Sequence, residues 1–167
     1  KQYADNINYV SILSAEEFSC TIECFAFPWE FLPCNGVVKT ANGMQIHQQN
    51  RTGFGFAWRS EKGNAEDQDA GYVLNLAYGL LASPTEEADN TVNDSPELKA
   101  MSFSCSATPV QVTGHGPTAI VKVDSTDPDV DPEGLAALED ELYGRAAVVA
   151  PNLPLPDEVD PLLTPTP

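Results

Sequence analysis

Apolar and polar residues alternate along several short segments of the chain, and this alternation predicts β-strands. Side chains at every second position of a strand point to the same face of a sheet, so an alternating segment has one apolar face and one polar face. Strands are predicted at 18–24, 54–59, 71–78, 101–107 and 118–125. The side chains predicted to form the core faces of these strands include Phe18, Cys20, Ile22, Phe54, Phe56, Trp58, Phe103 and Cys105.

One segment shows helical rather than alternating periodicity. Asp131 can cap a helix that starts at Pro132, and Gly144 suits the position just beyond its end. Three leucines at i, i+3 and i+7 predict the side of this helix that faces the core. These leucines are Leu135, Leu138 and Leu142.

The chain is predicted to form one mainly β domain of the α+β class over residues 1–150. Several antiparallel strands with one apolar face must cover one another, so we expect an antiparallel β-sandwich or barrel with one flanking α-helix. Residues 151–167 are rich in proline and are predicted to form an extended C-terminal arm.

Charge narrows the classes of function. The 167 residues include 25 acids and 8 bases, which gives a formal net charge of −17 and a pI near 4.1. Nucleic acids and anionic membranes bind through Lys and Arg, so this balance argues against both as ligands. The acids indicate either an ordinary soluble surface or a surface that must not retain DNA. No run of about 18 apolar residues occurs, so no membrane span is expected.

No recognisable chemistry accompanies these strands. Cys105, His115 and Asp124 could be combined into a thiol triad, but Cys105 is predicted on an apolar strand face, where a thiolate is disfavoured. The cysteines lack the spacing of a zinc site, and the acids of 125–133 lack the register of an EF-hand. We therefore expect no enzyme, no catalytic residues, no cofactor and no metal.

Four segments, taken in order, resemble the major tail protein of long-tailed (siphovirus-type) bacteriophages. They are "YADNINYVSILSAEEFSCTIECFAFPWEF", then "GFGFAWRSEKGN" with "GYVLNLAYGLLASPTEE", then "TVNDSPE" with "FSCSATPVQVTGHGPTAIVKVDST", and finally "LAALEDELYG" with "LPLPDEV". Members of that family carry further residues before the first segment, so the resemblance implies that an N-terminal part is absent from this chain.

The resemblance implies a structural virion protein, assembled in the host bacterial cytoplasm. Such subunits form hexameric rings that stack into a hollow tube, through which genome DNA passes at ejection without specific binding. The implied partners are copies of the chain itself and other tail proteins, namely the tape measure, tail terminator and tail tip. The alternative is a β-sandwich binding module, such as a capsid decoration or a host-surface adhesin domain.

A long acidic loop is predicted between the strands at 54–59 and 71–78. A hairpin needs only two to five residues to turn, so "EKGNAEDQDAG" is longer than the turn requires. The loop is either a mobile surface loop or, as the resemblance implies, a contact to an adjacent ring. In the second case Glu66, Asp67 and Asp69 would meet a polar or basic surface, such as that near Arg51 or Arg59.

Overall fold

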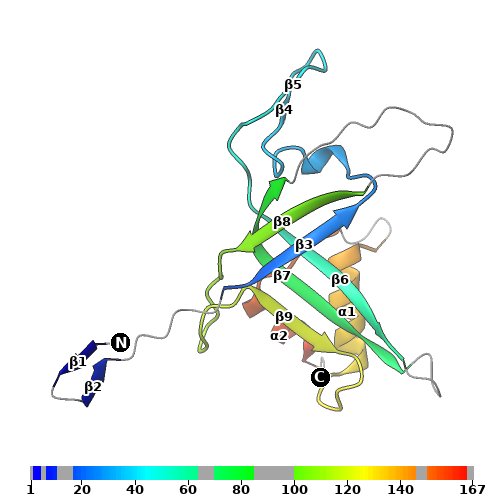
Figure 1. Ribbon diagram of the computed structural model, residues 1–167. Helices are drawn as coiled ribbons and strands as arrows, with labels where there is room; N and C mark the ends of the chain where they lie inside the picture. The colour runs from blue at the N-terminus through cyan, green and yellow to red at the C-terminus, as the bar shows by residue number, and fades with distance from the viewer. Residues whose placement is uncertain are drawn as a thin grey trace.

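The protein is mainly β, with a curled antiparallel sheet and two helices (Figure 1). The computed structural model describes residues 2–4, 7–10, 17–63, 70–84, 100–145 and 150–164. The described elements are β1 (Gln2–Ala4), β2 (Ile7–Val10), β3 (Ser19–Cys24), the 3-10 turn η1 (Trp29–Phe31), β4 (Val38–Lys39), β5 (Gln45–Ile46), β6 (Phe54–Lys62), β7 (Gly71–Pro84), β8 (Met101–Ala107), β9 (Ile120–Asp124), α1 (Pro132–Tyr143) and α2 (Pro156–Leu163).

The main sheet is built around the 14-residue strand β7. Its strand order is β3-β8-β7-β6, all antiparallel, and β9 also pairs with β7. One side of β7 pairs with β6, while the other pairs first with β9, along 73–77, and then with β8, along 80–84. The strands β1 and β2 pair with each other, as do β4 and β5.

A bulge at Gly79 shifts the alternation of β7 by one residue, so Leu80 faces the opposite side of the sheet from Leu76. Gly79 has φ +60°, and a Cβ atom there would lie 2.2 Å from the carbonyl oxygen of Thr108, so glycine is required. The β6–β7 register shifts beside it. Before the bulge, Leu76 and Tyr78 face the helices; after it, Leu80 lies in the core of the opposite face.

The first core lies between the sheet and the helices. Leu74, Leu76 and Tyr78 of β7 pack with Leu135 and Leu138 of α1, and all five side chains are buried. Leu142 is half-buried and packs against the same cluster, so the predicted leucine stripe does face the core. In the described part of the chain, the layer that covers this face is therefore a pair of helices rather than a second sheet.

The second core lies on the opposite face of the sheet. Phe103 and Cys105 of β8 are buried there, and the half-buried side chains of Phe18, Cys20, Ile22, Phe54 and Trp58 pack against them. The 3-10 turn covers this face with aromatic rings: Phe31 stands edge-on to Phe54 and Phe103 at centroid distances of 5.2 and 5.3 Å.

Phe56 is a correction to the predicted core faces. It is 39% exposed and stacks on Trp58, with ring centroids 5.7 Å apart. Phe54 and Trp58 both pack in the second core and Ala57 packs against the first, so Phe56 does lie on the predicted face of β6. What differs from the prediction is burial, because the described residues leave the Phe56 ring partly uncovered.

The caps predicted for α1 are present. The Asp131 carboxylate accepts a hydrogen bond from the Gly134 backbone N–H at 2.9 Å. Gly144 follows the helix with φ +79°, and its N–H donates to the Asp140 carbonyl at 3.0 Å. The sequence therefore specifies both ends of this helix locally.

The expectation of an extended C-terminal arm is wrong for residues 156–163, which form α2. Pro156 occupies the first helical position, where its missing N–H costs nothing, and Glu158 accepts a hydrogen bond from the Leu155 N–H at 2.8 Å. Val159 is buried in the first core. Packing on the domain thus stabilises a short helix despite Pro161 in its interior.

Candidate functional site

The most prominent candidate site is a surface rather than a cleft: the free edge of the main sheet at β3. In the described residues β3 pairs only with β8. The Ala107 N–H donates to the Phe18 carbonyl at 3.0 Å, and the regular register from there alternates hydrogen-bonded and non-hydrogen-bonded pairs. The backbone N–H and C=O groups of Ser19, Thr21 and Glu23 therefore point away from β8, as on any open edge.

Aromatic side chains are exposed beside the second core. Phe56 and Trp58 stack at the β6 end of this face, while Phe25 is 64% and Trp29 is 72% exposed near the 3-10 turn. Scattered apolar residues are normal on protein surfaces, but large aromatic side chains next to a half-covered sheet face indicate a contact surface.

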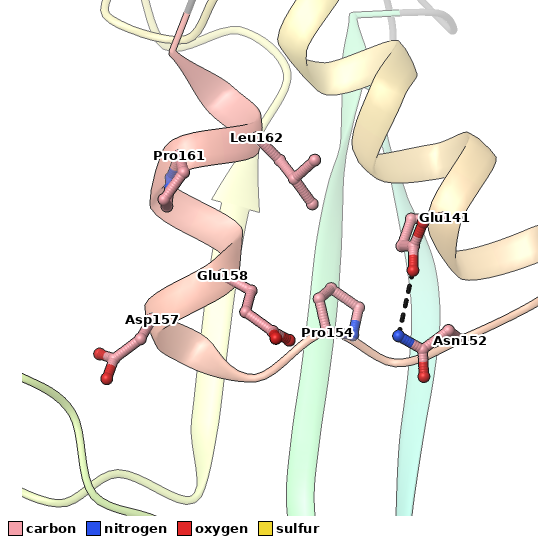
Figure 2. Close-up of a pocket in the computed structure, with 7 residues that line it drawn as sticks. All are labelled: Glu141, Asn152, Pro154, Asp157, Glu158, Pro161 and Leu162. Atoms are coloured by element: carbon pink, nitrogen blue, oxygen red, sulfur yellow. Dashed lines mark hydrogen bonds between the residues drawn. The ribbon is translucent and has the colours of Figure 1, made fainter.

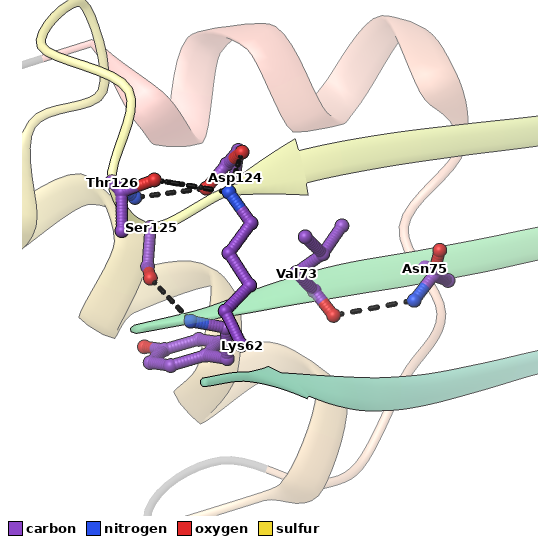
Figure 3. A network of polar contacts seen from close by, with 7 residues as sticks. Lys62, Val73, Asn75, Asp124, Ser125 and Thr126 are labelled. Atoms are coloured by element: carbon purple, nitrogen blue, oxygen red, sulfur yellow. Dashed lines mark hydrogen bonds and ion pairs between the residues drawn. The ribbon is translucent and has the colours of Figure 1, made fainter. Parts of the chain in front are cut away.

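A polar cluster joins the ends of β6 and β9 (Figure 3). The Lys62 ammonium pairs with the Asp124 carboxylate and donates to the Thr126 hydroxyl at 3.0 Å. Lys62 and the Thr126 backbone and hydroxyl donors lower the pKa of Asp124 to about 2. The Ser125 hydroxyl accepts a hydrogen bond from the Tyr72 N–H at 2.8 Å. The cluster fixes the strand ends from which the predicted acidic loop departs.

The acidic residues of that loop, Glu66, Asp67 and Asp69, lie outside the described residues. Arg51 and Arg59, near which the loop acids were expected to bind in an adjacent ring, already have hydrogen-bond partners within the subunit. Arg59 pairs with Glu61 at 2.7 Å and with Glu139 at 3.7 Å, and its guanidinium lies 4.0 Å from the centre of the Tyr72 ring.

Arg51 is also engaged, because its guanidinium donates to the Ala82 carbonyl at 3.0 Å and contacts the Ser83 hydroxyl at 3.3 Å. Arg59 is therefore already paired with acids of its own subunit, whereas Arg51 is held by neutral groups and has no ion pair among the described residues.

A hollow of about 440 Å³ lies between α1, α2 and the segment that joins them (Figure 2). Its lining combines carboxylates with apolar surface. The lining residues are Glu141, Asn152, Pro154, Asp157, Glu158, Pro161 and Leu162.

The carboxylates of the hollow are held by local hydrogen bonds. Glu141 accepts from the Asn152 amide at 3.0 Å, and Asp157 accepts from the backbone N–H and the hydroxyl of Thr113, both at 2.8 Å, which lowers the Asp157 pKa. In Figure 2 Glu158 and Leu162 point from α2 toward the space beside α1, whereas Asp157 points away from it.

The floor of the hollow is tied to the sheet. The Tyr78 hydroxyl donates to the Pro154 carbonyl at 2.9 Å, and burial, followed by the charge of Glu158, raises the pKa of Tyr78 to about 12. This tyrosine therefore remains a neutral donor that fixes the segment between the helices. Alternation predicted the strand at 71–78 that carries Tyr78, but it gave no sign of the hollow, which depends on α2.

The imagined thiol triad is not assembled as a reactive unit. Burial, followed by the nearby Cys20, raises the pKa of the Cys105 thiol to about 11, so the sulfur stays protonated. Asp124 contacts Lys62 and Thr126, as described above. The described residues contain no group of His, Cys, Asp and Glu side chains placed to hold a metal ion.

Neither described helix has the length and apolar character needed to cross a bilayer. No protein-family model matches the chain, and no curated protein or solved structure matches it either.

Proposed function

We propose that this chain is a structural subunit that assembles with copies of itself, as a tail-tube protein of the long-tailed bacteriophage type, and that it is not an enzyme. The observation that carries the proposal is the open edge of the main sheet. At β3 the backbone groups of Ser19, Thr21 and Glu23 point outward, and β6 is the edge strand at the other end of the same sheet. Pairing β3 of one copy with β6 of the next would join the sheets edge to edge and pair the outward backbone groups of these two strands.

The charge of the chain supports a conduit. Each subunit has a formal net charge of −17, and an overall charge of this sign repels phosphates, so a tube of such subunits is suited to passing DNA without retaining it. In this proposal the protein belongs to the virion, its partners are its own copies and other tail proteins, and no cofactor takes part.

Electron microscopy of the purified protein tests the proposal. We expect six-fold rings or tubes about 10 nm across, a width estimated from six domains of ordinary radius around a channel. A protein that stays monomeric at high concentration, measured by light scattering, would contradict the proposal.

Proline substitution tests the edge itself. Thr21→Pro removes an outward N–H and leaves the β3–β8 hydrogen bonds in place, so it should give a folded subunit that no longer forms rings. Lys122→Pro is the matched control: by the β7–β9 register its N–H also points outward, but on the β9 edge. Circular dichroism verifies that both variants fold. Loss of rings in both variants, or in neither, would refute β3 as the joining edge.

The exposed Phe56, stacked on the half-buried Trp58, favours one second candidate, a binding module for a host surface. Phe56 and Trp58 form a stacked platform of the kind that packs against sugar rings. Phe56→Ala should abolish binding to host-cell envelopes if this function holds, and should leave ring assembly intact.

A further inference from the structure

Charge is distributed very unevenly along this acidic chain. No Asp or Glu occurs between Glu30 and Glu61, although the whole chain has 25 acids. Conversely, between Asp127 and Asp160 the sequence has a single basic residue, Arg145. One segment of the subunit is therefore basic or neutral, and another is strongly acidic.

The acid-free segment contains the β4–β5 hairpin, which projects from the body of the protein (Figure 1). Val38 pairs with Ile46 across the hairpin, and the Thr40 N–H donates to the Met44 carbonyl at 2.9 Å to close its turn. Val38, Met44 and Ile46 are 48%, 60% and 39% exposed. A two-stranded hairpin with exposed apolar side chains gains little stability by itself, so its apolar surface calls for a partner.

The base of the hairpin is held firmly. Val37 is buried, and the Gln49 N–H donates to the Gly36 carbonyl at 2.9 Å. The hairpin is thus presented in a fixed direction, which lowers the entropy cost of binding through it.

Most cationic side chains in the described part of the chain already have partners within the subunit. These are Arg51, Arg59, Lys62 and Arg145. The ammonium groups of Lys39 in the hairpin and Lys122 in β9 have neither an ion pair nor a hydrogen bond among the described residues. Lys39 is consequently an available positive charge on an apolar hairpin.

The hollow between α1 and α2 has the complementary character. It is lined by carboxylates and by the apolar surfaces of Pro154, Pro161 and Leu162, and no cation lines it. Glu141 and Glu158 each make a hydrogen bond within the subunit, but a carboxylate has further acceptor positions for an ammonium group. Its volume is in the range that holds a drug-sized molecule, so the ends of two long side chains fit.

In Figure 1 the hairpin projects away from α1 and α2, so it reaches the hollow between them only in another molecule. We propose that the β4–β5 hairpin of one copy docks into the α1–α2 hollow of a second copy. The hairpin enters between the two helices, so that the face with Lys39 meets Glu141 and Glu158 and the opposite face, with Met44, packs against Leu162. Because the two surfaces differ, the contact is heterologous and repeats from copy to copy. This inference rests on the self-association proposed above and assigns a second contact to it, distinct from the β3 edge.

Zero-length cross-linking locates the contact. A water-soluble carbodiimide joins a lysine to a carboxylate only when the two are in contact, and a mixture of unlabelled and heavy-isotope-labelled protein identifies links between copies. We expect mixed-isotope peptides that join Lys39 to Glu141 or Glu158. Links from Lys39 to another hairpin or to other surfaces, without these, would overturn the proposal.

Charge variants test how much Lys39 and the carboxylates of the hollow contribute to the association constant. Lys39→Glu should weaken self-association, measured by analytical ultracentrifugation, at least about tenfold, since it brings a third carboxylate against Glu141 and Glu158. Lys122→Glu makes the same change of net charge elsewhere and should change the association constant less than about threefold. The double variant Glu141→Gln/Glu158→Gln keeps both hydrogen-bond acceptors and removes their charges, so it should weaken association and reduce its salt dependence.

The outcomes separate this contact from tube assembly. Lys39 cross-links between copies without rings or tubes would support the docking and refute the tube proposal. Rings or tubes that form equally well with Lys39→Glu would refute the docking and leave the tube proposal standing. A wild-type protein with neither assembly nor Lys39 cross-links would refute both.

Discussion

Replacing Gly134 by alanine tests the packing of α2 on α1, because two effects of opposite sign compete at this position. Alanine favours a helix over glycine by about 1 kcal/mol in a helix interior, and by less in the first turn, where Gly134 lies. A Cβ atom at Gly134, however, would lie 2.8 Å from the Leu162 carbonyl oxygen and from the carbonyl group of Leu163. Since these are backbone atoms, α2 would have to move, and overpacking of this kind costs about 1 to 3 kcal/mol.

We expect the clash to outweigh the helix propensity, so that Gly134→Ala lowers the free energy of unfolding by about 1 to 2 kcal/mol. Urea unfolding followed by circular dichroism measures the change. Gly116→Ala is the matched control, because a Cβ there meets no atom within 4 Å and its φ is not positive. The control should be neutral or stabilising, by about 0.4 to 1 kcal/mol. A Gly134→Ala protein more stable than the wild type would show that α2 does not pack here.

Further predictions concern the core, the thiols, an ion pair and the acidic loop. Leu138 is fully buried, so Leu138→Ala should cost about 2 to 5 kcal/mol of stability in urea unfolding, and a near-neutral result would place α1 off the sheet. Because the buried Cys105 thiol has a pKa of about 11, it should not react with a bulky disulfide reagent in the native protein and should react after unfolding. Rapid labelling of Cys105 in the native protein would contradict its burial. The Asp124 pKa is lowered to about 2, so the stability that its charge provides is present above about pH 4 and is lost as the pH falls toward 2. Lys62→Gln should raise the Asp124 pKa, measured by NMR titration, and should move acid unfolding to higher pH. An unchanged Asp124 titration in this variant would refute the pairing. Deleting residues 64–69 should leave the subunit folded but shorten or abolish the tubes. Tubes of normal length and salt resistance would show that the loop makes no contact between rings.

Strand positions were predictable where alternation is unbroken. Phe103 and Cys105 lie in an uninterrupted strand, and both are buried. The exposure of Phe56 was not predictable in this way, because alternation assigns it the face of Phe54 and Trp58, whereas the cover over each position of that face depends on tertiary packing.

The bulge at Gly79 was not predicted either. A glycine in a strand is typical of a bulge, but alternation alone does not show that Leu80 faces the opposite side of the sheet from Leu76.

The helix α2 in the C-terminal segment was not predictable for a different reason. Its proline content is typical of an extended chain, and a helix of 8 residues has little stability of its own. What stabilises α2 is the burial of Val159 and Pro156 against the rest of the domain. That stabilisation comes from tertiary contacts, so local sequence patterns predict neither the helix nor the hollow beside it.

The position of β7 has a consequence for how the domain unfolds. Because Gly79 turns this strand from one face to the other, Leu76 contributes to the core under the helices and Leu80 to the core under the 3-10 turn. The two cores therefore depend on the same strand, and a change in the register of β7 disrupts both of them. We expect a single cooperative transition in which fluorescence from the Trp58 side of the sheet and far-ultraviolet circular dichroism from the helices change together.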